Sequence, residues 1–131
     1  EGLEAKGRAA HLSVKLDGKF MPDDFKHEQS LVFDTEKGLV IMNSCSHGGA
    51  DNIVREVMET FPGKKIYAML GGFHLFCLPD EEVLAFGERL KQLDVQKIYT
   101  GHCTGQHAYE LLRGVLGERV EQLYTGMEII I

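Results

Sequence analysis

The sequence repeats one arrangement three times: a short apolar run, a loop that contains glycine and histidine, and a helix-like pattern. The apolar runs cover residues 39–43, 66–70 and 97–100. The loop after each run contributes one histidine, and these are His47, His74 and His102. Strands that alternate with helices of about a dozen residues are typical of layered folds. The arrangement therefore predicts an α/β (α+β) domain with a mixed sheet and about three helices.

The remaining segments complete this predicted domain. Apolar or alternating runs predict further strands at residues 11–16, 29–34, 119–124 and 127–131, and the strand of the first apolar run is predicted over residues 38–43. Helical spacing of apolar side chains predicts helices over residues 53–61, 83–93 and 108–116. Residues 21–25 read as a loop, and residues 1–10 have no clear period and read as a frayed lead-in. We expect residues 1–131 to form a single domain.

Composition excludes several classes of protein. The formal net charge of −6 leaves no basic patch, so neither nucleic acid nor an anionic membrane surface is an expected partner. No apolar stretch approaches the roughly eighteen residues of a membrane span, and no signal peptide is visible. The three cysteines form no CxxC pair, which argues against a disulfide framework and favours a reducing, cytoplasmic location.

The three repeated histidines are expected to share one pocket. In layered α/β sheets, ligands collect beyond the carboxyl ends of the strands, where the loops converge. Imidazole is the commonest protein ligand for zinc, and a catalytic zinc site typically has three protein ligands and an open water position. Such a metal lowers the pKa of its bound water to about 7. The pattern predicts His47, His74 and His102 as ligands of a divalent metal, zinc first and manganese or iron as alternatives.

The other polar residues near these loops are given structural roles. His11, His27 and His107 lack the strand-end placement and are expected to be structural or solvent-facing. Cys45 and Cys103 lie within two residues of a candidate ligand, where thiolate ligation and buried packing are both open. Cys77 is expected to pack in the interior. Side-chain oxygens favour helix N-caps, and the residues expected to act in this way are Asp51 and Asn52. The loop carboxylates are expected to be solvated, and these are Asp23, Asp24 and Glu28.

Four blocks of the sequence carry a family resemblance. They read EQSLVFDTEKGLVIMNSCSHGGADNI (28–53), MLGGFHLF (69–76), IYTGHCTGQHAYELL (98–112) and LYTGMEI (123–129). In this order they closely resemble the second half of metallo-β-lactamase-fold metal-dependent hydrolases, over about residues 22 to 131. The most similar branch is the one labelled dihydropterin ribofuranosyl-aminobenzene phosphate synthase-like. The resemblance implies half of an αββα sandwich with one or two metals, usually zinc, at one edge.

The resemblance also implies roles for the three histidines. His47 matches the single histidine ligand that follows the family's HxHxDH loop, and His102 matches the last histidine ligand. The GGFH block falls where many members carry an aspartate that bridges two metals. That block contains no aspartate here, so His74 either replaces it as a ligand or lines the pocket, where it would polarise the substrate.

The HxHxDH loop itself is absent from these 131 residues, and the sequence contains no H-x-H pair. Because full members are roughly twice as long, the chain reads as the C-terminal half of the fold. Three situations remain open: part of a longer hydrolase, a half that pairs with a separate N-terminal half or with its own copy, and a degenerate relative that binds without turnover.

Two functional hypotheses follow. The first is a metal-dependent hydrolase in which a metal-activated water attacks an ester or phosphoester bond of a small, possibly phosphorylated molecule. We expect the isolated chain to be inactive in that case. The alternative is a non-catalytic ligand-binding or dimerising half-domain whose histidines are relics of a metal site.

Overall fold

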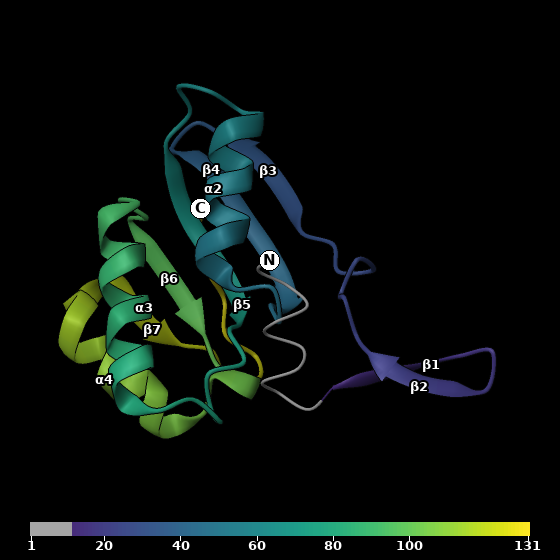
Figure 1. Ribbon diagram of the computed structural model, residues 1–131. Coiled ribbons are helices and arrows are strands. Elements are labelled where there is room, and N and C mark those ends of the chain that lie inside the picture. The colour runs from purple at the N-terminus through teal and green to yellow at the C-terminus, as the bar shows by residue number, and fades with distance from the viewer. Residues whose placement is uncertain (1–11) are drawn as a thin grey trace.

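The computed structural model describes residues 12–131 and contains two sheets (Figure 1). A small hairpin, β1 (Ser13–Leu16) and β2 (Lys19–Pro22), projects from the rest of the molecule. The main sheet has the strand order β3-β4-β5-β6-β7. Its strands are β3 (Leu31–Thr35), β4 (Gly38–Cys45), β5 (Ile66–Gly72), β6 (Lys97–Thr100) and β7 (Val120–Gln122). The helices are α2 (Ala50–Thr60), α3 (Asp80–Gln92) and α4 (Gln106–Leu116), with 3₁₀ turns η1 (His102–Thr104) and η2 (Gly117–Arg119).

The main sheet is mixed, as the sequence predicts. β3 and β4 form an antiparallel hairpin, whereas β4, β5, β6 and β7 run parallel to one another. α2 follows β4, α3 follows β5 and α4 follows β6, so each helix is the crossover between two parallel strands. The carboxyl ends of β4, β5 and β6 consequently lie at one edge of the sheet, and the loops that leave them meet there. The predicted fold class, with three helices on a mixed sheet, is confirmed.

One face of the sheet carries the core. Alternate residues of β4 point toward the helices, so that Leu39 and Ile41 join Met69 and Ile98 in one buried cluster. Val54, Leu90 and Leu112 supply the helical side of the same cluster. Full burial of a side chain of this size contributes about 1.5–3 kcal/mol. This packing holds the three strand ends, and therefore the loops of the candidate site, in a fixed relation.

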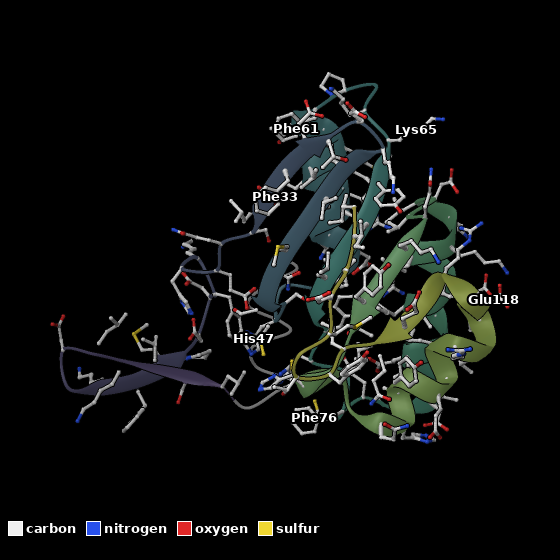
Figure 2. All side chains as sticks on the ribbon, turned by 180° about the vertical axis from the view of Figure 1, so that it is seen from behind. Phe33, His47, Phe61, Lys65, Phe76 and Glu118 are labelled. Atoms are coloured by element: carbon white, nitrogen blue, oxygen red, sulfur yellow. The ribbon has the colours of Figure 1, made fainter. Side chains whose placement is uncertain are left out.

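The opposite face is covered in part by the C-terminal segment (Figure 2). Met127 and Ile129 pack there against a second, smaller cluster centred on Val40, Ala68 and Tyr99. The strand predicted at residues 127–131 is therefore wrong, because these apolar residues pack across the sheet instead of pairing with it. The strand predicted at 119–124 is confirmed in its first part, as β7.

Part of this face is exposed. Leu31, Phe33 and Met42 form a strip on β3 and β4, which we call the β3–β4 strip, and each is more than 40% exposed. Leu31 pairs with Met42, and Phe33 pairs with the buried Val40, so the strip continues the smaller cluster outward. Figure 2 shows Phe33 on this face.

The projecting hairpin was only half predicted. Its first strand lies within the expected segment 11–16, but Met21 and Pro22 belong to β2, not to a loop. Asp17 and Gly18 have φ values of 48° and 79°, the positive values that a tight two-residue hairpin turn requires. All four residues of β2 are exposed, so the strand has no alternation that a sequence pattern could detect. Residues 1–10 and His11 lie outside the described residues. Within residues 12–131, no helix has both the length and the apolar character that crossing a membrane needs.

Candidate metal centre

The loops after β4, β5 and β6 bring nitrogen and sulfur donors together. The potential ligand atoms of Cys45, His47 and His74 lie within 4.8 Å of one another. Those of Cys45, His102 and Cys103 form a second group within the same limit. Cys45, the last residue of β4, belongs to both groups, so its sulfur lies between the His47–His74 pair and His102. The three histidines singled out in the sequence thus surround Cys45 at one edge of the sheet.

His47 is the most firmly held of the three. Its Nδ1 hydrogen-bonds to Oε1 of Glu28. The backbone N–H groups of His47 and Gly48 donate to the same carboxylate, at 2.9 and 3.2 Å. Phe25 stacks on the imidazole, with ring centroids 4.6 Å apart and planes 13° from parallel. Because the carboxylate accepts the Nδ1 proton, Nε2 keeps its lone pair and is the nitrogen available to a metal.

Glu28 was not recognised from the sequence, where it was expected to be a solvated loop carboxylate. Its side chain is only 18% exposed and makes three hydrogen bonds to the loop after β4. Glu28 and His47 are 19 residues apart, and nothing in the local pattern distinguishes Glu28 from the neighbouring acids. Only the path of the chain from β2 to β3 brings it to the histidine.

His74 has an unusual environment. Its backbone is in the left-handed region, with φ at 50°, and its ring lies 4.5 Å from that of His47. The Nδ1 atom is buried and has no hydrogen-bond partner among residues 12–131. Burial lowers the pKa of His74 below 6.5, and the nearby His47 and His102 lower it further, while Glu28 acts in the opposite direction. A neutral imidazole with an unpartnered nitrogen is the form that binds a metal.

The lowered pKa of His74 predicts a pH dependence of stability. The unfolded chain binds the His74 proton more tightly than the folded chain does, so the free energy of unfolding should fall as pH drops from about 7 toward 5. Urea unfolding of the chelator-treated chain at these pH values measures the change. His74→Gln should reduce this loss, whereas the exposed His27→Gln should retain it. An unchanged loss in His74→Gln would contradict the assignment.

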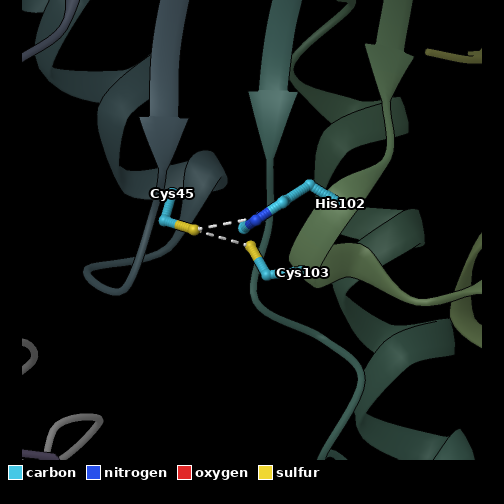
Figure 3. A group of neighbouring side chains, drawn as sticks. All are labelled: Cys45, His102 and Cys103. Carbon is cyan, nitrogen blue, oxygen red and sulfur yellow. Dashed lines mark hydrogen bonds between the residues drawn. The ribbon is translucent and has the colours of Figure 1, made fainter. Parts of the chain in front are cut away.

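Two cysteines lie beside the histidines. Their Sγ atoms are 2.9 Å apart, and Cys45 Sγ is 3.6 Å from Nδ1 of His102 (Figure 3). Both are free and half-buried. Burial, followed by the hydrogen bond with Cys45, raises the pKa of the Cys103 thiol to about 12. The third cysteine, Cys77, is exposed in the turn after His74, so its predicted interior packing is wrong.

The other assigned roles have mixed outcomes. His27 and His107 are largely exposed, as expected. The capping prediction is wrong, because the N-cap of α2 is Gly49 and has no side-chain cap bond. Asp51 instead lies in the first turn, where its buried carboxylate accepts a 2.7 Å hydrogen bond from Nε of Arg89 on α3. The pair therefore joins α2 to α3 behind the loop that carries His47.

A groove of about 460 Å³ borders the site. It lies between the 25–30 segment and α2, and Glu28 and Gly48 form the end of it that faces His47. Half of its other lining residues are apolar, among them Val32, Ile53 and Phe61, and the other half are polar or charged. None of the three candidate histidines lines it, so the groove lies behind the carboxylate and not over the potential metal ligands.

Comparison with known proteins finds two that the chain resembles. No family model matches the chain. The chain is 38% identical over 109 residues to 7,8-dihydropterin-6-methyl-4-(beta-D-ribofuranosyl)-aminobenzene-5'-phosphate synthase of Methanocaldococcus jannaschii, a match that covers 83% of this chain and 37% of that enzyme. The fold of this chain matches the crystal structure of Tm1679, a metal-dependent hydrolase of the β-lactamase superfamily, with a TM-score of 0.85 and 33% identity. That match covers 91% of this chain and 46% of Tm1679.

The chain thus spans less than half the length of either relative. Both relatives are enzymes, one named a synthase and the other a hydrolase. The fold match and the synthase match agree with the resemblance seen in the SCSHGG and GHCTG blocks. The chain has part of the metallo-β-lactamase fold and is similar in sequence to enzymes that carry it.

Proposed function

We propose that this chain supplies the C-terminal ligands of the metal site of a metal-dependent hydrolase. His47 and His102 would bind the metal, with His74 as a third ligand or as a group that polarises the substrate. The observation that supports this most is the pairing of Nδ1 of His47 with Glu28, beside the buried Nδ1 of His74, which has no hydrogen-bond partner among the described residues. Metal-binding histidines typically donate their other ring nitrogen to a carboxylate in this way.

The donor set fits a divalent metal of borderline softness. Imidazole nitrogens suit zinc and iron, and the adjacent thiols favour zinc over manganese. When bound, such a metal supplies Lewis acidity and makes water nucleophilic at neutral pH. The residues of this chain would hold and orient it: Glu28 fixes the tautomer of His47, and Phe25 covers one face of that imidazole.

An ester or phosphoester is the bond class we propose for hydrolysis. α2 begins three residues after His47, and α4 begins four residues after His102. The positive ends of two helix dipoles therefore lie next to the candidate ligands, an arrangement that favours an anionic group such as phosphate. The name of the synthase relative includes a phosphate group, which agrees with a phosphorylated substrate for this chain.

Metal analysis tests the proposal directly. Purified chain should retain at least one divalent metal per molecule after gel filtration, measured by elemental mass spectrometry. His47→Ala and His102→Ala should each lose most of it because each removes a ligand, while the exposed His27→Ala should not. We expect no hydrolysis of a generic phosphoester by the isolated chain. A wild-type chain without metal, or equal metal content in every variant, would exclude the proposal.

The second candidate is a dimerising or ligand-binding half-domain with relic histidines. The exposed β3–β4 strip favours it, because an apolar strip at a sheet edge is typically covered by another polypeptide layer. A separate N-terminal half or a second copy of the chain would each cover the strip. The strip is equally compatible with the hydrolase proposal, so the metal content of the histidine variants is what separates the two functions.

A further inference from the structure

We propose that Cys45, Cys103 and His102 form a thiol-rich metal position of their own, next to the His47–His74 pair. Two thiolates and one imidazole would bind a zinc-like divalent cation and leave a fourth position open. The inference deepens the proposed function and rests on it for His102 as a metal ligand, but it groups His102 with the two thiols, to whose sulfur atoms it lies within 4.8 Å. Cys45 belongs to both groups of potential ligands, and the inference assigns its sulfur to the group with His102 and Cys103.

The distances support coordination by these three atoms. In a tetrahedral zinc site with metal–sulfur bonds of about 2.3 Å and metal–nitrogen bonds of about 2.0–2.1 Å, sulfur and nitrogen ligands lie about 3.6 Å apart. The separation of Cys45 Sγ from Nδ1 of His102 is 3.6 Å. The same geometry places two sulfur ligands about 3.8 Å apart, whereas the two thiols are 2.9 Å apart. A displacement of one sulfur by about 1 Å, through rotation about the Cα–Cβ bond of its cysteine, would bring the two thiols to that separation.

The backbone has a specific opening for the two sulfurs. β4 and β6 are not neighbours, because β5 lies between them (Figure 3). Cys45 pairs with Gly72 of β5, and a Cβ at position 72 would lie 2.6 Å from Sγ of Cys103. Only a residue without a side chain allows the Cys103 thiol to reach across β5. The contact between the thiols thus depends on the glycine at this position.

Without a metal, burial and the hydrogen bond with Cys45 raise the pKa of Cys103, so its thiolate would form only as a metal binds, and one contact favours that form. The backbone N–H of His74 donates to Sγ of Cys103, at 3.3 Å, and such donors stabilise a sulfur that carries negative charge. Potential ligand atoms of His47, His74, His102 and Cys103 all lie within 4.8 Å of the Cys45 sulfur. His102 also has a positive φ of 53°, a strained conformation for a residue other than glycine, and such strain is concentrated at functional sites.

Metal binding at this position exchanges thiol protons for the metal ion and changes no oxidation state. Each cysteine loses the proton of its S–H bond to solvent and forms one sulfur–metal bond, so two protons are released for each divalent ion bound. The two thiolate charges neutralise the charge of the ion. Binding at this position should therefore weaken at low pH and be reversed by a strong chelator.

Cobalt absorption tests the inference because Co²⁺ bound to thiolate has a strong near-ultraviolet charge-transfer band that histidine ligands lack. The reduced, chelator-treated full chain should develop this band in proportion to the Co²⁺ added, up to one equivalent. Cys45→Ser and Cys103→Ser should each lose at least half of the band. The matched control is Cys77→Ser, which changes an exposed cysteine in the same way and should leave the band intact.

Two further variants separate this inference from the proposed function. His47→Ala should keep the cobalt band, because His47 is not one of the three ligands, even where it lowers the total metal content. Gly72→Ala should lose the band, since its Cβ displaces the Cys103 sulfur. Three results would overturn the inference. They are absence of the band in the wild-type chain, persistence of the band in both Cys45→Ser and Cys103→Ser, and a Cys45–Cys103 disulfide that survives treatment with reductant. Circular dichroism of each variant checks that the fold is retained.

Discussion

Replacing Gly71 with alanine is expected to destabilise the chain by about 2–6 kcal/mol. Gly71 lies in β5 with φ at 152°, a region that side-chain-bearing residues rarely adopt. A Cβ there would lie 2.3 Å from the carbonyl oxygen of Asn43 on β4 and 2.9 Å from its side-chain oxygen. β4 would have to move away from β5, at the irregular register between Met42 and Cys45. Backbone strain and overpacking therefore both lower the free energy of unfolding of Gly71→Ala.

Urea unfolding followed by circular dichroism measures this effect. The control is Gly114→Ala, the same change on the exposed side of α4, where an added Cβ meets nothing within 4 Å. Alanine in a helix interior is favoured over glycine by about 1 kcal/mol, so this variant should be slightly more stable than the wild type. A Gly71→Ala variant as stable as the wild type would show that the β4–β5 junction yields more easily than its geometry implies.

Replacing Glu28 with glutamine is expected to weaken metal binding about 10- to 100-fold. The carboxylate accepts hydrogen bonds through both oxygens, from the ring and backbone of His47 and from the N–H of Gly48. Glutamine has one acceptor, so its amide N–H₂ must face either the imidazole or the loop. The negative charge that strengthens the imidazole as a ligand is also lost. The His47 ring would then sample other tautomers and orientations.

Zinc affinity measured against a competing chelator tests this prediction. Glu36→Gln removes the same charge from the exposed turn between β3 and β4 and should bind zinc like the wild type. Affinities of Glu28→Gln within twofold of the wild type would mean that His47 does not need this carboxylate. The prediction is specific to metal affinity, so the unfolding midpoint of the metal-free chain is measured alongside it.

The sequence predicted the elements that have a strong local pattern. Helices α2, α3 and α4 have apolar side chains at helical spacing because one side of each is buried against the sheet. Strands β4, β5 and β6 were found for a similar reason, since each contains consecutive buried residues. β3 was found from its apolar residues, although none of them is buried. The placement of His47, His74 and His102 at one edge followed from the parallel order of strands alone.

The missed features depend on contacts between distant parts of the chain. The strands of the β1–β2 hairpin bury little against the main sheet, so no alternation marks them. Residues 127–131 are apolar enough for a strand, but their partners are side chains on the sheet face and not a neighbouring backbone. Glu28 reaches His47 across 19 residues, and Cys45 reaches Cys103 across 58. The residue types alone do not predict contacts between residues so far apart in the sequence.

Local periodicity and strand-end loops were therefore enough to determine the layered α/β class and the edge of the sheet where the histidines gather. The tertiary structure alone decided how that edge is chemically composed: a carboxylate behind His47, an unpartnered nitrogen on His74, and two thiols meeting over Gly72. The reason is physical. The sequence pattern of a helix or strand reflects which of its sides is buried. The geometry of a metal site depends instead on how packing places segments that are distant in the sequence.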